Sequence, residues 1–516
     1  MVRKEHSVSP VYPLSVSALS VLYADVFFIK SPFANFMLIL LSIVILSLIF
    51  AYQRLLCHKK KESISIFLCL CCLFGTISGA LCAYEITYEK KEITCLANRS
   101  KISSLTAVLL SDPVPYGTDL YRAQARLESG KYPDGSEFSV NGKCSLCIPA
   151  WMEKEYLPGG IGHTQGSAYL CASGLTADFF GRFGEYSPEQ GETFFVTALS
   201  VDSVKWDSPL SSIRARLRLS LTRILYEWRD AGGFLLALFS ANRDYLEPSL
   251  ANDFKNTGLS HILALSGMHL SLMGLVAIQV GKRIGGKRLS IKLSLFAIVF
   301  FVWFAGLSPS LDRALLMAIA MIALRRLGFE VKVLPVLSAA AYIQMLINPS
   351  DALSLAYMLS YGALWGILVF AERIAFVIPK LVPDFLIKDL SASIGAQVMT
   401  TPIIVLCIGV VAPVGIIASC ILSPLSSIFL VVGMMLAGVR VVLPFTDSIC
   451  AYIVNVLYQM NVVSVEFFAH IHPLSIKGLP ATIVTGLIPV FTGFLVMYLF
   501  AKCLKRRSPD DSFAGL

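Results

Sequence analysis

Apolar residues run along this chain in long stretches separated by short polar ones. Many of these stretches approach the ~20 residues that an α-helix needs to cross a bilayer. They predict spans at 33–53, 64–84, 261–281, 291–307, 310–325, 333–347, 352–370, 391–410, 412–440, 448–468 and 482–502. A weaker stretch at 14–29 contains Asp25 and fits either a further span or a surface helix. We therefore expect an α-helical polytopic membrane protein with about 11–12 spans.

One long polar segment interrupts this pattern, from about Glu85 to Lys205. Its short β-branched or aromatic runs, such as TAVLL, FSVNG and TFFVTALSV, alternate with the turn signals DPVPYG, YPDG and LPGG. We expect an inserted small β domain that resembles an OB fold in position, and a five-stranded barrel fits. Its 11 Lys and Arg against 15 Asp and Glu give a net charge of −4, which disfavours a uniform nucleic-acid-binding surface.

These patterns divide the chain into five parts. They are N-terminal spans at 1–84, an extracytoplasmic β domain at 85–205, a basic interfacial helix at 206–231, a membrane core at 232–440, and C-terminal spans with a tail at 441–516.

Composition and charge support the membrane class and suggest an orientation. The chain is 56% hydrophobic and 15% charged, with a mean hydropathy of +0.70, well outside the range of soluble enzymes. Clusters of Lys and Arg fall between alternate predicted spans, for example at 282–292 and 325–332. The positive-inside rule then places the C-terminus in the cytoplasm and the β domain outside.

The predicted interfacial helix carries four arginines interleaved with leucine and isoleucine. They are Arg214, Arg216, Arg218 and Arg223. One interpretation is a helix whose arginines extend to lipid headgroups. The other is a basic collar at a pore mouth that attracts polyanions.

The stretch GLSHILALSGMHL places His261, Ser266, Gly267 and His269 at the start of a span. Polar groups at membrane depth are costly and usually functional. Ser-Gly pairs are frequent sites of kinks and discontinuous helices. We therefore expect this segment to line a pathway, with its histidines donating to an anionic solute or to a freed carbonyl. A metal shared by the two histidines is not expected, because they lie about 12 Å apart along a helix.

Other polar positions within predicted spans are candidates for the same lining. Arg313 is the strongest, because a lone arginine in a span usually faces a cavity or a partner; a structural role beside Asp312 is the alternative. The remaining candidates are Ser310, Ser360, Gln397 and Thr401. Helix breaks are expected at Gly258, Gly267, Gly306, Pro309 and Pro402.

Four of the 13 cysteines lie in the β domain. They are Cys95, Cys144, Cys147 and Cys171. In an oxidising compartment, disulfides are their expected use. No metal or cofactor is predicted, and no G-x-x-x-x-G-K-[ST] loop occurs that would bind a nucleotide triphosphate.

Four segments in order resemble the ComEC family, the inner-membrane DNA-uptake channels of natural competence. The first begins at GGFLLALFSANRDYLEPSL and includes GLSHILALSGMHL; the others are FAGLSPSLDRALLMA, NPSDALSLAYMLSYGALWGIL and SIGAQVMTTPIIVLCIGVVAPVGIIASCILSPL. Together they cover roughly 232–430. The sequence differs from the family in Asp312 and Cys420, and it shows no metallo-β-lactamase-like segment.

This resemblance implies a multi-pass protein of the bacterial inner membrane that imports single-stranded DNA during natural transformation. Its implied partners are single-stranded DNA, membrane lipids, an external DNA receptor, a separate nuclease, a cytoplasmic ATPase motor and single-strand-binding proteins; a homo-oligomer is left open. Moving a full negative charge inward costs about 2.3 kcal/mol per 100 mV, which is why a motor is required.

Two other functions remain open from the residues. One is a small-solute or lipid transporter on the same helical scaffold. The other is an intramembrane hydrolase with Ser266 as nucleophile and His269 as base, although neither neighbouring span offers a clear carboxylate to orient the histidine. We expect a channel rather than an enzyme.

Overall fold

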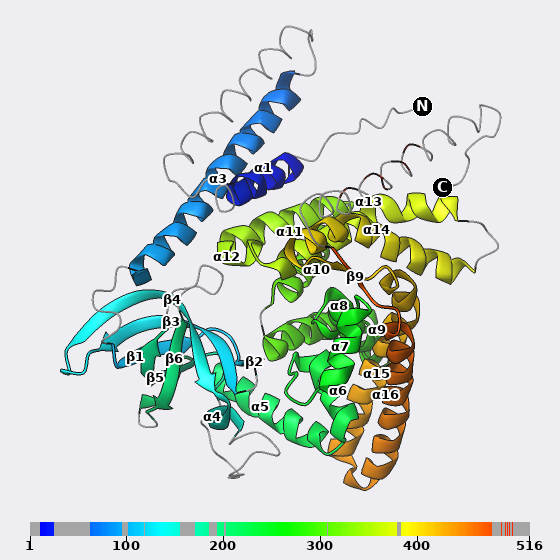
Figure 1. Ribbon diagram of the computed structural model, residues 1–516. Helices are drawn as coiled ribbons and strands as arrows, with labels where there is room; N and C mark the ends of the chain where they lie inside the picture. Colours follow the sequence, from blue (N-terminus) through cyan, green and yellow to red (C-terminus); the bar gives the residue numbers. More distant parts are fainter. Residues whose placement is uncertain are drawn as a thin grey trace, which may run out of the picture.

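The computed structural model describes residues 11–24, 62–94, 102–117, 119–154, 171–184, 193–200, 203–306, 308–378 and 383–476, with single positions between 487 and 498. A β barrel stands beside a larger group of helices (Figure 1). The helices α1 (Val11–Ala24) and α3 (Glu62–Thr94) precede the barrel in the chain. The predicted span at 33–53 lies outside the described residues, as does nearly all of 482–502.

The barrel is closed by five strands. Its order is β1 (Ser104–Leu109), β3 (Leu120–Lys131), β4 (Glu137–Pro149), β6 (Thr193–Leu199) and β5 (Leu175–Phe183), which pairs back with β1. These pairings are antiparallel except β4 with β6, which is parallel. The short elements around it are β2 (Val114–Tyr116), α4 (Ala150–Lys154) and β7 (Lys205–Trp206). The predicted five-stranded barrel is confirmed.

Apolar side chains fill the barrel interior. Strand β3 alternates buried and exposed positions along most of its length, as expected for a strand with one face inward. Leu105, Leu127, Leu146, Phe179 and Phe194 are at most 1% exposed. A five-stranded barrel filled in this way has a packed core and no lumen, so a ligand of this domain must bind to its outside or its rim.

Helices make up the rest of the described chain. In order they are α5 (Pro209–Tyr226), α6 (Arg229–Ser240), α7 (Pro248–Asn256), α8 (Ser260–Leu263), α9 (Gly267–Ala305), α10 (Pro309–Arg326), α11 (Val333–Ile347), α12 (Pro349–Ala352), α13 (Leu355–Val377), α14 (Asp384–Cys407), α15 (Gly415–Val442), the short 3-10 turn at Pro444–Thr446, and α16 (Asp447–Ala469). A two-stranded ribbon, β8 (Val410–Val411) with β9 (Leu474–Ser475), joins the ends of α14 and α16.

Five helices in the described part are long and apolar enough to cross a membrane: α9, α13, α14, α15 and α16 with its preceding turn. This is fewer than the 11–12 spans predicted. Charged residues at both ends of α10 limit its apolar length, and α11 has only 15 residues. α1 is also short, at 14 residues or about 21 Å.

The longest of these helices, α9, is a hairpin of two spans. Gly285 and Gly286 interrupt it with non-helical dihedral angles, and Gly286 has φ 71° and ψ −163°. A Cβ on Gly281 would lie 2.5 Å from Ser290 Cα, and one on Gly274 would lie 3.3 Å from Ser294 Oγ. The two arms therefore run side by side in opposite directions, which agrees with the separate spans predicted at 261–281 and 291–307.

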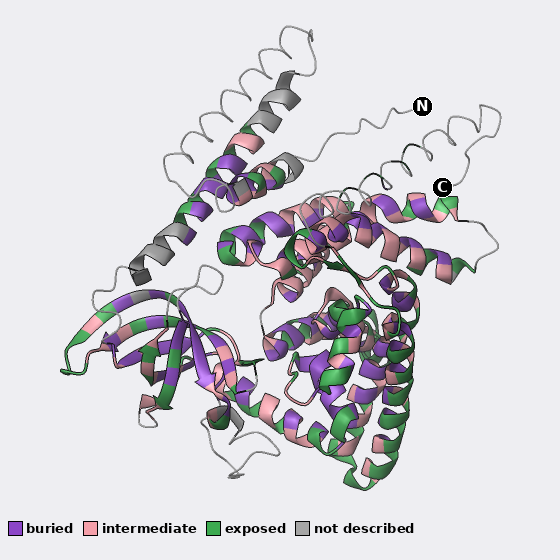
Figure 2. Ribbon diagram, viewed as in Figure 1, coloured by how far each residue is buried: buried purple, intermediate pink, exposed green. Residues whose placement is uncertain are grey.

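The centre of the helical group is α6. Every residue from Ala231 to Ser240 is buried (Figure 2), which is the pattern of a helix enclosed on all sides. Phe234 contacts Phe429 of α15 at 4.9 Å and Tyr458 of α16 at 5.9 Å between ring centroids. Leu235 fills the space opposite Gly433 of α15. This core holds α6, α15 and α16 together.

Basic residues mark every second turn between consecutive helices from α9 to α16. They occur at 282–292 in the α9 hairpin, at 325–332 between α10 and α11, at 373–388 around the α13–α14 connection, and at Arg440 before α16. The intervening turns at 306–308, 348–354 and 408–414 contain no Lys or Arg. The order of the helices thus agrees with the charge alternation that the sequence shows.

Candidate functional site

The chain is unwound between α8 and α9, where the sequence predicts a break. Ala264 has ψ 138° and Ser266 has φ −128° and ψ 165°, both extended, and α9 begins at Gly267. The Ser266 backbone N–H donates to Nδ1 of His269 at 3.2 Å, and His269 is 1% exposed. The imidazole therefore accepts a hydrogen bond from the helix start at Nδ1, and its predicted role as a donor falls to Nε2 and stays a prediction.

Arg313 lies against this break. A Cβ on Gly267 would be 3.3 Å from its Nη2, so the glycine leaves room for the guanidinium. Arg313 Nη1 donates to the carbonyl of Ser360, and the guanidinium lies over the Tyr361 ring at 5.8 Å. Its Nε is buried without a hydrogen-bond partner, and no ion pair within the described residues involves Arg313. Asp312 is thus not its partner there.

A polar seam extends from Arg313 into α11. Tyr361 Oη donates to Oε1 of Gln344 at 2.9 Å, and Nε2 of Gln344 donates to the Pro309 carbonyl at 3.2 Å. Tyr357 Oη donates to the Ala341 carbonyl at 2.8 Å. Gln344 was missed from the sequence, although an amide in the otherwise apolar span 333–347 was a usable signal. The seam links the start of α10 with α11 and α13.

The structure brings together only part of the predicted lining. Gly267, Arg313 and Ser360 meet, with Ser266 and His269 at the adjoining break. His261 is exposed on α8, and Ser310 is partly buried on α10. Gln397 and Thr401 lie on α14, and no hydrogen bond within the described residues joins either to Arg313. The roles of these four residues stay predictions.

Four of the five predicted helix breaks lie at helix ends. Gly258 follows α7 with φ 74°, Gly267 begins α9, Gly306 ends α9 with φ 100°, and Pro309 is the first residue of α10 after the Ser308 cap. The prediction for Pro402 is wrong, because α14 continues through it to Cys407. Proline removes one backbone donor, and a helix packed among neighbours tolerates that loss.

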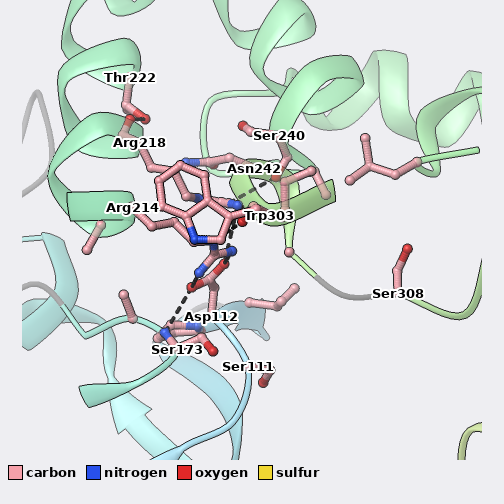
Figure 3. Close-up of a pocket in the computed structure, with 18 of the residues that line it drawn as sticks. Ser111, Asp112, Ser173, Arg214, Arg218, Thr222, Ser240, Asn242, Trp303 and Ser308 are labelled. Atoms are coloured by element: carbon pink, nitrogen blue, oxygen red, sulfur yellow. Dashed lines mark hydrogen bonds and ion pairs between the residues drawn. The ribbon is translucent and has the colours of Figure 1, made fainter. Parts of the chain in front are cut away.

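Two arginines of α5 join the barrel to the helices. Arg214 binds Asp112, in the loop between β1 and β2, through Nη1 at 3.0 Å and Nη2 at 2.6 Å, and Arg218 lies 3.3 Å from the same carboxylate. Arg214 Nε donates to the carbonyl of Trp303 at 2.7 Å, and Arg218 Nη1 donates to that of Ala305 at 2.6 Å. We call these contacts the junction clamp (Figure 3).

The two arginines of the clamp keep Asp112 in its ionised form. Burial alone would raise the pKa of Asp112, but the nearby guanidinium groups of Arg218 and Arg214 and the Ser173 amide outweigh burial and hold this pKa at about 2. Asp112 is therefore ionised at neutral pH. The two arginines also bind the carbonyls at the C-terminal end of α9, where cations are favoured.

The other end of α5 reaches the connection between α15 and α16. Arg440 binds the Ile224 carbonyl and the Glu227 carboxylate, and Trp228 Nε1 donates to Asp447 at 3.0 Å. α5 therefore contacts the end of α9 near its beginning and the α15–α16 connection near its end. Its position at the membrane interface stays a prediction. Its arginines do not form one collar, because Arg214 and Arg218 are committed to the clamp.

The other two arginines of α5 differ from the clamp pair in burial. Arg216 is exposed and Arg223 is half-buried. Their assignment to a pore mouth stays a prediction.

A cavity of about 570 Å³ lies beside the junction clamp. Its walls come from the barrel loops 110–115 and 171–173, from α5, from the loop 240–244 after α6, and from the end of α9. It extends to Leu265, directly before the Ser266 break, and to Ser308 and Leu315 at the start of α10. The cavity thus connects the rim of the barrel with the helices that carry the polar seam.

The cysteines of the barrel do not form one cluster. Cys144 and Cys171 belong to its apolar core, whereas Cys147 lies on β4 three residues after Cys144 and on the opposite face of that strand. Cys95 lies outside the described residues, and the disulfides stay a prediction. Within the described part of the chain, no three His, Cys, Asp or Glu side chains are grouped as metal ligands.

Comparisons with known proteins agree with this architecture. The family model described as "Competence protein" matches residues 238–504, just over half of the chain. ComE operon protein 3 of Bacillus subtilis (strain 168) is 27% identical over 142 residues, which are 27% of this chain and 18% of that protein. No solved structure matches the chain. The match contains the break, Arg313 and the polar seam, and the chain is a membrane protein of the Competence protein family.

Proposed function

We propose that this protein is an inner-membrane channel that conducts single-stranded DNA into the cytoplasm during natural transformation. The observation that carries the proposal is Arg313: a half-buried arginine at a helix break, with its Nε buried and its guanidinium held by a carbonyl and an aromatic ring, in the family-matched region. A guanidinium at membrane depth without an ion pair is costly unless it serves a polar ligand or pathway. A phosphate is a ligand that arginine binds well.

Charge alternation supports an inward direction. Basic turns alternate with turns that lack Lys and Arg, and the junction clamp fixes the barrel to the end of α9, next to the uncharged turn at 306–308. If the basic turns face the cytoplasm, the barrel faces outward and the C-terminus inward. The strand then enters beside the barrel and leaves on the cytoplasmic side.

The barrel itself fits an OB-like module. Its five strands close with β6 inserted between β4 and β5 and parallel to β4, an order that is not sequential, as in Greek-key barrels of the OB type. Partners complete the proposed machine: an external receptor delivers DNA, a nuclease removes one strand, and a cytoplasmic ATPase with single-strand-binding proteins supplies the inward pull.

The test is uptake of labelled DNA by a deletion strain complemented with the wild type, Arg313→Ala, Arg313→Lys or Arg326→Ala. We expect Arg313→Ala to reduce uptake about tenfold or more, the scale of one lost charged hydrogen bond. Arg313→Lys keeps the positive charge but loses the planar guanidinium with its paired N–H donors, so partial uptake is expected. Arg326 is exposed at the end of the same helix and serves as the control.

Membrane levels of each variant must be measured alongside, because a protein that fails to accumulate also fails to import. Undiminished uptake in the deletion strain would overturn the channel proposal and favour the small-solute or lipid transporter. Wild-type uptake by Arg313→Ala at normal protein level would remove Arg313 from the pathway.

A further inference from the structure

The cavity at the junction has an aromatic wall. Trp303, near the end of α9, lines it and is only partly buried, and its ring is seen at the cavity in Figure 3. Phe300 supports the indole from one side, with ring centroids 5.6 Å apart. The Trp303 carbonyl is fixed by Arg214 at 2.7 Å. A tryptophan held in this way is a rigid platform on which a planar ring can stack.

The charge in the cavity suits a phosphodiester. Its ionisable lining groups are three arginines and two aspartates, a net charge of +1. Asp112 is neutralised within the junction clamp, and Asp244 accepts a hydrogen bond from Tyr121 Oη at 2.9 Å. Arg243 donates to the Leu263 carbonyl at 3.2 Å, and no ion pair in the described part of the chain involves it.

The clamp also reduces the repulsion between the carbonyl groups at the end of α9 and an anion in the cavity. The carbonyls of Trp303, Phe304 and Ala305 end α9 and would present partial negative charge to an anion in the cavity. Arg214 and Arg218 bind all three. Hydroxyl groups of Ser111, Ser173 and Ser308 complete a polar lining. A phosphate therefore meets neutralised carbonyls and one arginine without a carboxylate partner.

From this geometry we infer that the junction cavity binds one nucleotide unit of a single strand, with its base stacked on Trp303 and its phosphate next to Arg243. A cavity of about 570 Å³ is of the size that small ligands occupy. Because the cavity reaches Leu265 and Ser308, the next nucleotide lies at the Ser266 break and at the start of α10. The inference rests on the proposed function and gives that path its entry site.

Direct binding tests the inference. The purified full-length protein in lipid nanodiscs is titrated with a fluorescent 12-nucleotide oligothymidylate, and anisotropy reports binding. Trp303→Leu and Arg243→Gln should each weaken binding about fivefold or more, the lower end of one base stack or one charged contact. Trp151→Leu, an exposed tryptophan on α4, and Arg283→Gln, at the α9 hairpin turn, are the matched controls and should bind like the wild type.

A second titration separates stacking from charge. An oligonucleotide whose bases are replaced by abasic sites should bind the wild type more weakly, and Trp303→Leu should add little to that loss, because both changes remove the same stack. Trp303→Phe keeps a ring and should restore part of the binding. Arg243→Gln should weaken the abasic strand as well.

Crosslinking tests the unmodified protein. An oligonucleotide carrying 5-iodouracil is irradiated with the wild type, and labelled peptides containing Trp303 are the expected result. Labels confined to other segments, or binding by Trp303→Leu and Arg243→Gln equal to the controls, would overturn the inference. If these results came with lost uptake in the deletion strain, only the nucleotide site in the cavity would be refuted and the channel proposal would hold. Undiminished uptake in that strain would refute the channel proposal itself.

Discussion

At the residue scale, Asp112 links the barrel to the helices through two arginines. One carboxylate is the counter-charge of both Arg214, whose side chain is 7% exposed, and Arg218, whose side chain is 15% exposed. A buried charge pair contributes little net stability compared with apolar packing, but removal of one partner leaves a charge buried alone. The attachment of the barrel to α9 therefore depends on Asp112.

Asp112→Asn should lower the free energy of unfolding by about 3 kcal/mol, because two guanidinium groups lose their counter-charge. The thermal midpoint of the purified protein in detergent measures this loss. Asp134→Asn is the control: it lies in the exposed turn after β3, where a surface substitution changes stability by about 0.5 kcal/mol or less. Equal midpoints for the two variants would contradict a stabilising clamp.

The lowered pKa of Asp112 also predicts a pH dependence. A carboxyl with a pKa of about 2 in the folded protein and 3.8 as its ordinary value contributes stability that is fully present above about pH 4. That contribution, about 2 kcal/mol, is lost as pH falls from 4 towards 2. Wild-type unfolding curves should shift more steeply over this interval than those of Asp112→Asn. Parallel shifts would mean that Asp112 is not the group responsible.

At the scale of elements, glycine allows α13 and α14 to pack with their backbones in contact. A Cβ on Gly366 would lie 2.2 Å from the Gly395 carbonyl oxygen, whereas one on Gly362, one turn earlier on α13, would lie 3.5 Å from its nearest neighbour, Ile403 Cδ1. Small residues at helix interfaces let membrane helices approach in this way. The position of α13, which carries Ser360 and Tyr361, depends on this contact.

Gly366→Ala should therefore separate the two helices and cost about 1–3 kcal/mol. Gly362→Ala is the matched control, since it adds a methyl group at ordinary contact distance and improves helix propensity by up to about 1 kcal/mol. Thermal midpoints in detergent should fall for the first variant and stay or rise for the second. The same fall for both would show that the close approach is not what sets the cost.

At the scale of the whole molecule, the alternation of basic turns and the position of the barrel predict opposite sides for two surface turns. Gly135 lies in the turn before β4, and Gly328 lies in the turn after α10, next to Arg325 and Arg326. Both glycines have positive φ, and a Cβ added at either would have no neighbouring atom within 4 Å. Short epitope insertions therefore fit at both turns.

An epitope inserted at Gly135 should react with antibody in intact spheroplasts, and one inserted at Gly328 should react only in inverted membrane vesicles. A periplasmic and a cytoplasmic marker protein report the integrity of each preparation. Both epitopes reacting from the same side would refute the proposed orientation and, with it, the inward direction of transport.

Predictions from the sequence were most successful where a single local rule decides the structure. Glycine with positive φ ends helices at Gly258 and Gly306, proline begins α10 at Pro309, and the Ser266–Gly267 pair breaks the chain as predicted. Pro402 shows the limit of such rules, because packing around α14 compensates the lost donor. Five helices of the described part meet the length and hydropathy required of a span, and the total of 11–12 for the whole chain stays a prediction.

The sequence alone predicts the class of protein. Its apolar stretches predict membrane helices, its alternating strand pattern predicts the barrel, and its motifs occur in the order typical of one family. Which polar groups meet could be learned only from the three-dimensional arrangement. Asp112 and Arg214 lie 102 positions apart, and Arg313 and Ser360 lie 47 apart. No local pattern encodes such pairs, because burying a charge is favourable only where the fold brings a partner to it.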